Sequence, residues 1–245
     1  MKTPEEIKKQ ALELARSGRF IEGIYNYCDR WCEKCAFRSK CFSYANSPDY
    51  DEMSDDDTVE YITNNLEATM LMLDEIAKEM GVDLSEIPDD ETGIEKYKPF
   101  SDPLSAFARE ASDEAHDWLE SVEPETGIKK INSLKLFTEE KKEYHDALEV
   151  IFYYLIFISV KLERAVRSAD EAIENEYMKD DSDGSAKVAL IAIDRSIAAW
   201  GIIMKERPEY EDAILQFLIK LSKIRSEAEN RFPDARSFIR PGLDE

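Results

Sequence analysis

Apolar residues recur at the spacing of an α-helix in almost every long segment of this chain, and no segment alternates convincingly between polar and apolar residues. Apolar side chains three and four positions apart share one helix face, whereas a half-buried strand requires alternation. The 245 residues include only 8 Gly and 9 Pro, too few for a turn-rich β fold. The sequence therefore predicts an all-α fold, a roughly seven-helix bundle with a short cysteine-bearing helical hairpin at the N-terminus.

Local signals place the ends of the expected helices. Thr3 is a favourable N-cap with Pro4 at the first helical position, and Ser54 precedes three aspartates that suit the positive end of a helix dipole. Glycines at 18 and 81 are typical helix terminators. Five expected helices cover about residues 4–18, 54–81, 104–122, 185–205 and 208–232. Another begins at about residue 20 and runs towards the cysteines, and another begins at residue 138 and extends as far as residue 177.

Two helices carry marked apolar faces. The helix over 54–81 has an apolar stripe that we expect to face the core, formed by Val59, Ile62, Leu66, Thr69, Met70, Leu73, Ile76, Ala77 and Met80. The helix that begins at Thr138 is apolar on nearly all sides between Ala147 and Leu162, which predicts a central helix surrounded by the others. The polar run 179–184 predicts a break after this helix. We expect residues 1–50 to form the cysteine-bearing hairpin and 51–245 the helical bundle, unless the two make one continuous domain.

Charge and hydropathy narrow the functional classes. The 32 Lys and Arg residues oppose 54 Asp and Glu, a formal net charge of −22. Nucleic-acid binding requires clustered cations, so neither a nucleic acid nor an anionic membrane is an expected partner. The longest charge-free apolar run, from Val150 to Val160, has eleven residues, whereas a membrane span needs about 20. The polar N-terminus does not resemble a signal peptide, and we expect a cytoplasmic protein.

All four cysteines fall within fourteen residues, at Cys28, Cys32, Cys35 and Cys41. The cytosol keeps thiols reduced, so this C-x3-C-x2-C-x5-C segment predicts a metal site rather than disulfides. If the preceding helix continues through Cys35, the first three cysteines form one stripe and the fourth joins from the following turn. The alternative is that these are small apolar side chains packed on an amphipathic helix.

The spacing of these cysteines favours an iron–sulfur cluster over zinc. Structural zinc usually takes thiolates from two separated C-x2–4-C pairs, whereas here all four come from one segment that has no Gly or Pro between its first and last cysteine. A 4Fe–4S cluster is larger and is also held by four thiolates. We expect Cys28, Cys32, Cys35 and Cys41 to bind such a cluster in an electron-transfer, redox-sensing or structural role, with a redox or protein partner. A structural zinc site in a helical interaction protein is the first alternative.

Two resemblances bear on this segment. Cys28-x3-Cys32-x2-Cys35 is similar in spacing to the cluster-binding motif of radical S-adenosylmethionine enzymes, which place it after a strand of a β/α barrel. The residues before Cys28 read as a helix and no βα pattern follows, so membership of that family is not predicted. Cys32-x2-Cys35-x5-Cys41 resembles part of the auxiliary-cluster segment of some of those enzymes, which implies that the spacing suits a cluster.

A carboxylate di-metal oxidoreductase is the second alternative, because acidic helical bundles can hold two metal ions between their helices. Such a site uses Glu-x-x-His motifs, and neither His116 nor His145 stands in one. His145 could still form a polar core site with Glu67, Glu149 and Asp194, although salt bridges and caps explain these residues better. A buried Asp194 would need a partner from a crossing helix. Nothing in the sequence indicates a substrate, a named reaction or an oligomeric state.

Overall fold

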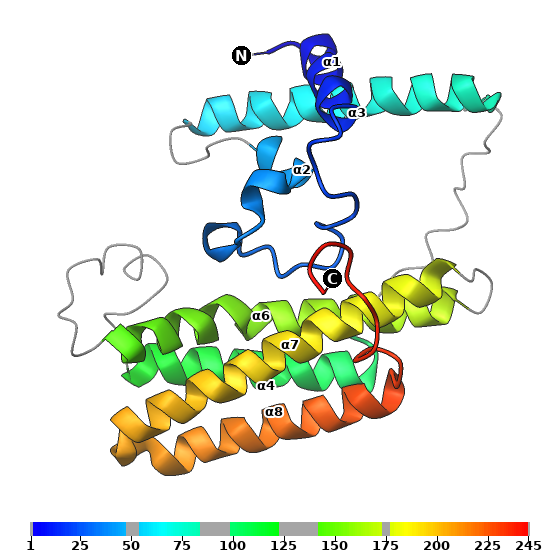
Figure 1. Ribbon diagram of the computed structural model, residues 1–245. Coiled ribbons are helices and arrows are strands. Elements are labelled where there is room, and N and C mark those ends of the chain that lie inside the picture. The colour runs from blue at the N-terminus through cyan, green and yellow to red at the C-terminus, as the bar shows by residue number, and fades with distance from the viewer. Residues whose placement is uncertain (1, 48–53, 84–98, 123–141, 173–176, 245) are drawn as a thin grey trace. The chain divides into compact units, whose positions relative to one another are not determined.

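A computed structural model describes residues 2–47, 54–83, 99–122, 142–172 and 177–244, and this part of the chain is all-α without a β-strand (Figure 1). This confirms the predicted fold class. The seven α-helices of the described ranges are α1 (Pro4–Ala15), α2 (Phe42–Ala45), α3 (Asp55–Met80), α4 (Pro103–Val122), α6 (Lys142–Glu171), α7 (Tyr177–Glu206) and α8 (Glu211–Arg231). Three short 3-10 helices accompany them, η1 (Cys32–Lys34), η2 (Arg38–Lys40) and η6 (Pro208–Tyr210).

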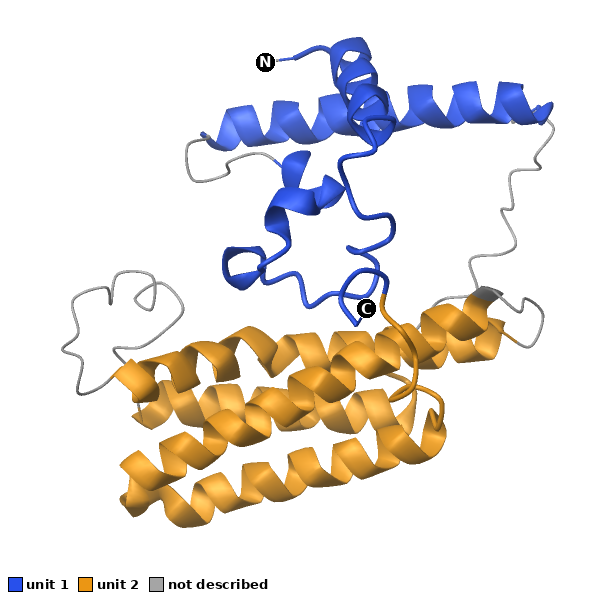
Figure 2. Ribbon diagram, viewed as in Figure 1, with its two compact units in different colours: residues 1–97, 241–245 blue, residues 98–240 orange. Residues whose placement is uncertain are grey.

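The chain divides into two compact units, shown in separate colours in Figure 2. Unit 1 comprises residues 1–97 together with the C-terminal residues 241–245, and unit 2 comprises residues 98–240. Helix α3 lies after the boundary expected at residue 50, yet it packs against α1 within unit 1. None of the described helices is long and apolar enough to span a membrane.

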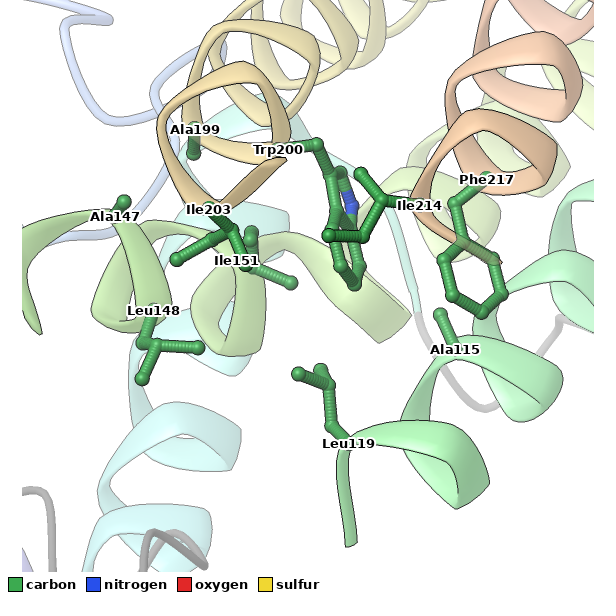
Figure 3. Close-up of a cluster of buried hydrophobic side chains, with 10 residues drawn as sticks. All are labelled: Ala115, Leu119, Ala147, Leu148, Ile151, Ala199, Trp200, Ile203, Ile214 and Phe217. Carbon is green, nitrogen blue, oxygen red and sulfur yellow. The ribbon is translucent and has the colours of Figure 1, made fainter. Parts of the chain in front are cut away.

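Unit 2 is a ring of four helices, in which α6 packs against α4 and α7, and α8 packs against the same two helices (Figure 1). Apolar side chains from all four helices meet in the middle, and Trp200 and Phe217 stack there with ring centroids 4.9 Å apart (Figure 3). The buried members of this cluster are Ala115, Leu119, Ala147, Leu148, Ile151, Ala199, Trp200, Ile203, Ile214 and Phe217.

The prediction that α6 is surrounded by the other helices is wrong. Each helix of a four-membered ring has two neighbours, so one of its faces remains outside. Accordingly Ile156 and Val160 of α6 are about half exposed, at 51% and 47%, while Ile151, Tyr154 and Leu162 are buried. The start of this helix predicted at Thr138 lies outside the described residues, and α6 ends at Glu171 rather than near 177.

The break predicted at 179–184 is also wrong, because α7 is helical from Tyr177 onward. Polar residues in the first turns of α7 form hydrogen bonds with residues of α6, and these bonds stabilise the helical conformation there. The Ser182 hydroxyl donates to the Ala165 carbonyl at 2.9 Å, and the Asp181 carboxylate accepts from the Ser168 hydroxyl at 2.6 Å. Ser182 and Ser185 are buried, and their small side chains allow α7 to pack close to α6.

In unit 1 the predicted start of α1 and both predicted ends of α3 are confirmed, whereas α1 ends at Ala15, before Gly18. Thr3 and Glu6 form a reciprocal capping box at the start of α1, and the Ser54 hydroxyl accepts the Asp57 N–H at 3.2 Å at the start of α3. Gly81 ends α3 in the left-handed conformation, with φ of 70°. Helix α1 crosses α3, where an ion pair joins Lys8 to Glu75 and Ala68 is fully buried.

The prediction that the apolar stripe of α3 faces the core is wrong for its large residues. Val59, Leu66 and Met70 are 63–65% exposed and Met80 is 72% exposed. Helix α1 packs on the opposite side of α3, next to Asn64 and Leu71, and therefore leaves the stripe open. Periodicity identified the apolar face correctly but not the face that α1 covers.

Candidate metal centre

The residues that precede the cysteines do not form the helix predicted from about residue 20. Residues 22–28 form successive turns, and only short 3-10 helices follow before α2. Gly23 and Arg30 both adopt the left-handed conformation, with φ of 71° and 62°, which no α-helix contains. The cysteines therefore do not form a stripe on one helix face, and turns position them instead.

These turns form a closed loop, which we call the cysteine loop and define as residues 21–41. The Ile21 N–H donates to the Lys40 carbonyl at 3.0 Å and joins the two ends. Cys32 and Cys35 flank the single turn η1, where the Cys35 N–H donates to the Cys32 carbonyl at 3.2 Å. Cys41 follows η2 and donates its N–H to the Arg38 carbonyl at 3.3 Å. All four cysteines thus lie at turn boundaries of one closed segment.

Two adjacent bends connect Cys28 to Cys32. Arg30 supplies the left-handed residue, and Trp31 has φ of −80° and ψ of 71°, the values of an inverse γ-turn. The Cys32 N–H accordingly donates to the Arg30 carbonyl at 2.9 Å. A helical path would have placed a full turn between the two cysteines, whereas these bends reverse the chain direction within three residues.

The four thiols are half-buried and free, and they are close enough to influence one another electrostatically. Burial is the main cause that raises the pKa of Cys28, and a hydrogen bond from the Arg30 backbone N–H opposes this rise. Burial also raises the pKa of Cys32, and Cys28, Cys41 and Cys35 add to that rise through like charge. An N–H directed at a sulfur stabilises a thiolate, as hydrogen bonds do around metal-bound cysteines.

The surroundings of the loop combine cations and aromatic rings. Between residues 28 and 41, four Lys and Arg residues oppose two acids, a net charge of +2 in a protein of net −22. Those cations are exposed, and the Lys34 ammonium lies 5.6 Å from the centre of the Trp31 ring. At the two ends of the loop, just outside it, Phe20 packs edge-on against Phe42 with ring centroids 5.8 Å apart. Nearby cations favour the ionised form of a thiol, the form that binds metals.

The C-terminal tail supports this loop, a feature that the sequence did not indicate. Gly242 has φ of 65°, and a Cβ at this position would lie 2.4 Å from Cγ2 of Ile21, the residue that closes the loop. Pro241 approaches the Cβ position of Gly23 to 3.5 Å. The dipeptide Pro241-Gly242 is a local signal for a turn, but nothing in the sequence places that turn against residues more than 200 positions earlier.

The other candidate residues do not come together in the described part of the chain. Glu67 belongs to unit 1, whereas His145, Glu149 and Asp194 belong to unit 2. His116 lies at the surface, 3.8 Å from Glu120. Among the described residues, no three His, Cys, Asp or Glu side chains stand in the arrangement of a metal site, and this holds for the cysteine loop as for the bundle.

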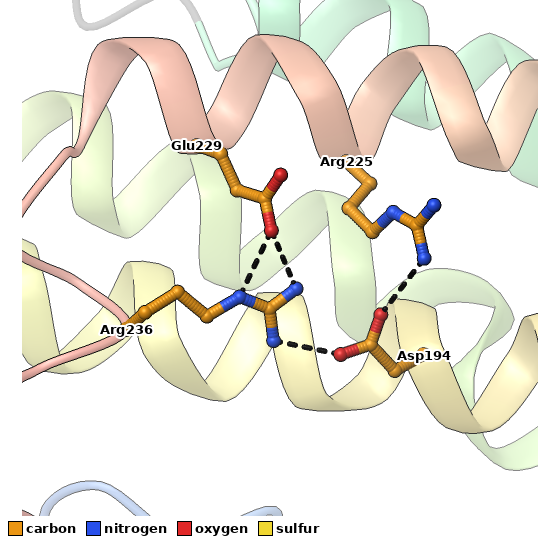
Figure 4. A network of polar contacts seen from close by, with 4 residues as sticks. All are labelled: Asp194, Arg225, Glu229 and Arg236. Atoms are coloured by element: carbon orange, nitrogen blue, oxygen red, sulfur yellow. Dashed lines mark hydrogen bonds and ion pairs between the residues drawn. The ribbon is translucent and has the colours of Figure 1, made fainter.

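Asp194 takes part in a salt-bridge network instead of a metal site (Figure 4). Its carboxylate accepts from Arg225 of α8 at 3.3 Å and from Arg236 of the tail at 2.7 Å. Arg236 also binds Glu229 of α8, with two nitrogens on one oxygen. The partner expected from a crossing helix is present, although Asp194 itself is 40% exposed.

Comparison with known proteins found no matching family model, no matching curated protein and no matching solved structure. The chemistry of the cysteine loop is therefore inferred from its own residues.

Proposed function

We propose that this protein is a cytoplasmic metal-binding protein that holds an iron–sulfur cluster, of the 4Fe–4S type, through Cys28, Cys32, Cys35 and Cys41. One observation carries the proposal: a single closed loop holds all four cysteines of the chain, and their thiols interact electrostatically. Four side chains buried merely as small apolar residues would not need to share one loop of 21 residues. A common ligand explains why they do.

The chemistry of the loop fits an anionic sulfur ligand set. The Arg30 N–H already faces the Cys28 sulfur, and the loop has a local charge of +2. Four cysteines can hold a cubane cluster, whose potential depends on hydrogen bonds to the sulfurs and on solvent exposure. The four sulfurs do not stand together as a metal site in the described loop, so ligation would require side-chain rotation or movement of the turns that carry Cys32, Cys35 and Cys41.

Full ligation by cysteine indicates which roles suit such a cluster. Four protein thiolates leave no open iron for a substrate, so electron transfer, redox sensing or structural support fits better than Lewis-acid catalysis. The half-exposed cysteines lie near the protein surface, where an electron could be exchanged with a partner protein. The exposed cations around them would face that partner.

A structural zinc site is the second candidate, and one feature favours it. Cys32 and Cys35 flank a single 3-10 turn, and a C-x2-C turn is a common source of two zinc ligands. Cys28 and Cys41 would complete a four-sulfur set. This arrangement would stabilise unit 1 and would leave its surface to bind a protein partner.

Metal and sulfide analysis, with a visible spectrum, separates these candidates on protein purified without oxygen. The proposal predicts a brown protein with about four iron and four sulfide per chain, whose visible absorption bleaches with dithionite. Colourless protein with one zinc per chain would support the second candidate instead. Protein that binds neither metal, as purified or after anaerobic reconstitution, would overturn both.

Serine variants test the ligand set. Cys28→Ser, Cys32→Ser, Cys35→Ser and Cys41→Ser should each lower cluster content several-fold. Ser39→Ala, an exposed position in the same loop, is the matched control and should retain the cluster. If Cys28→Ser leaves metal content and stability unchanged, Cys28 is not a ligand and the four-cysteine site is refuted.

A further inference from the structure

An exposed apolar surface lies along α3 in the described part of unit 1. Seven large apolar side chains, 47–72% exposed, line one side of this 26-residue helix. We call them the α3 seam: Val59, Ile62, Leu66, Met70, Leu73, Ile76 and Met80. At a rise of 1.5 Å per residue the helix is about 39 Å long, so the seam is a continuous strip rather than scattered exposed residues. Strips of this kind mark interaction surfaces.

The seam has the spacing of a coiled-coil interface. Val59, Leu66, Leu73 and Met80 recur every seven residues, and Ile62, Thr69 and Ile76 recur every seven residues between them. This is the a and d pattern of a heptad repeat, which lets one helix pack along another helix. The Ser54 cap and the left-handed Gly81 fix both ends of α3, so the helix that carries the seam is well defined.

The charge pattern of α3 allows a second copy of the same acidic chain to approach. Of the six e and g positions beside the a and d residues, only Glu79 is charged; the others are Thr63, Asn65, Met72, Ala77 and the seam residue Met70. The acids Glu60, Glu67 and Asp74 lie beyond this flank. Because e and g residues face the partner helix in a coiled coil, a net charge of −22 per chain adds little repulsion at this interface.

The order of the seam residues points to an antiparallel partner. An antiparallel copy, related by two-fold symmetry about a point at Leu71, would set Leu66 opposite Ile76 and Ile62 opposite Met80, because the a residues of one antiparallel helix lie opposite the d residues of the other. A two-fold axis through that point gives a self-complementary interface, which is the usual geometry of homodimers. A parallel copy would place two sets of the acidic first turn, Asp55–Asp57, side by side.

The size of the seam is sufficient for a stable contact. Seven side chains of this size, about half to three-quarters exposed, offer on the order of 700 Å² per chain, against about 800 Å² per partner in a standard interface. We propose that two copies of this chain associate through the α3 seam as an antiparallel helix pair. The pairing rests on the apolar face of α3 and requires no metal in the cysteine loop.

The mass of the protein in solution tests this pairing directly. Light scattering after gel filtration, at concentrations up to about 100 µM, should give twice the 28.3 kDa of one chain. The combined variant Leu66→Glu with Leu73→Glu brings carboxylates together at the centre of the seam and should weaken association on the order of a thousandfold. Lys78→Glu makes the same net charge change on the same helix away from the seam, and should remain dimeric.

A charge-pair experiment tests the antiparallel order and does not depend on one disruptive variant. Ile62→Lys alone and Met80→Glu alone should each weaken the dimer. The two combined should restore it, because each new ammonium would face a new carboxylate of the other copy. Circular dichroism should show the native helix content in all variants.

Three outcomes would overturn the proposal. A single-chain mass of the unaltered protein at 100 µM would mean that another part of the chain or a different partner covers the seam. A dimer that survives Leu66→Glu with Leu73→Glu would mean that another face mediates association. A combined Ile62→Lys and Met80→Glu variant that associates less than either single variant would exclude the antiparallel order.

Discussion

Replacement of Trp200 by alanine should destabilise the four-helix ring of unit 2 more than any other single truncation in its core. Trp200 is 2% exposed and contacts two aromatic rings: its ring centroid lies 4.9 Å from that of Phe217 (Figure 3) and 5.9 Å from that of Trp118. It is among the largest fully buried side chains of the described chain. Its removal would leave a cavity bounded by α4, α7 and α8.

The expected cost follows from the area that this side chain buries. A buried aromatic side chain removes about 150–250 Å² from water, which at about 25 cal/mol per Å² corresponds to about 4–6 kcal/mol. Measured Phe and Trp truncations in protein cores cost about 3–5 kcal/mol, because neighbours partly fill the cavity. We therefore expect a loss of about 4 kcal/mol. Trp200→Phe, which keeps an aromatic ring in the cluster, should lose less than half of that.

Urea unfolding followed by circular dichroism measures this loss. With a slope of about 2 kcal/mol per molar urea, a loss of about 4 kcal/mol lowers the midpoint by about 2 M. Ile219→Ala is the matched control on α8, because Ile219 is 53% exposed and its truncation should cost less than about 1 kcal/mol. A Trp200→Ala midpoint within about 0.5 M of the unaltered protein would refute the packing of this core.

Three further changes test the loop, the tail and the salt-bridge network. Burial raises the pKa of Cys28 in the folded metal-free protein, so the unfolded chain loses this proton first as pH rises. The stability of the metal-free protein should therefore fall above about pH 8, whereas protein with ligated thiolates should not show this fall; urea unfolding at pH 7 and 9.5 compares them. Gly242→Ala combines a left-handed φ with a Cβ 2.4 Å from Cγ2 of Ile21 and should expose the tail to limited proteolysis, unlike Gly201→Ala, where the added methyl meets nothing within 4 Å. Asp194→Asn removes a half-exposed carboxylate from two arginines and should lower the free energy of unfolding by about 1 kcal/mol, and a loss above about 3 kcal/mol would contradict the solvent screening expected there.

The start of α1 and both ends of α3 could be predicted from the sequence because capping is local chemistry. The side chains of Thr3 and Glu6 each accept the backbone N–H of the other residue, and the Ser54 hydroxyl accepts the N–H of Asp57. Gly81 ends α3 because a residue without Cβ enters the left-handed region at little cost. None of these signals depends on what the helix packs against.

The neighbours of each apolar face could not be predicted in the same way. Periodicity locates the stripe of α3 and the apolar length of α6, but it does not say which element lies against them. Leu66 and Ile156 both read as core residues, and both are more than half exposed. Conversely, the polar sequence at Ser182 and Asp183 predicted an exposed loop, but both residues are buried in α7. The Ser182 hydroxyl donates a hydrogen bond to a carbonyl of α6, which allows its burial.

At the candidate site too, a local pattern could be predicted from the sequence, whereas contacts with distant residues could not. The spacing of Cys28, Cys32, Cys35 and Cys41 predicted a shared ligand, and that prediction did not need the local conformation. The predicted helix was wrong because Gly23 and Arg30 take the left-handed conformation, and because Pro241 and Gly242 pack beside this segment from the far end of the chain. Contacts between residues so distant in sequence leave no local pattern.

The electrostatics of the loop connects this geometry with the proposed ligand. A Zn²⁺ ion held by four thiolates carries a net charge of about −2, and an oxidised 4Fe–4S cluster with four thiolates has about the same charge. Elsewhere on a chain of net −22, such a site would lie among like charges. Residues 28–41 instead carry a net +2, which offsets the charge of either site where it would form. The local cations therefore favour the same proposal as the four cysteines, that of an anionic metal–sulfur centre in this loop.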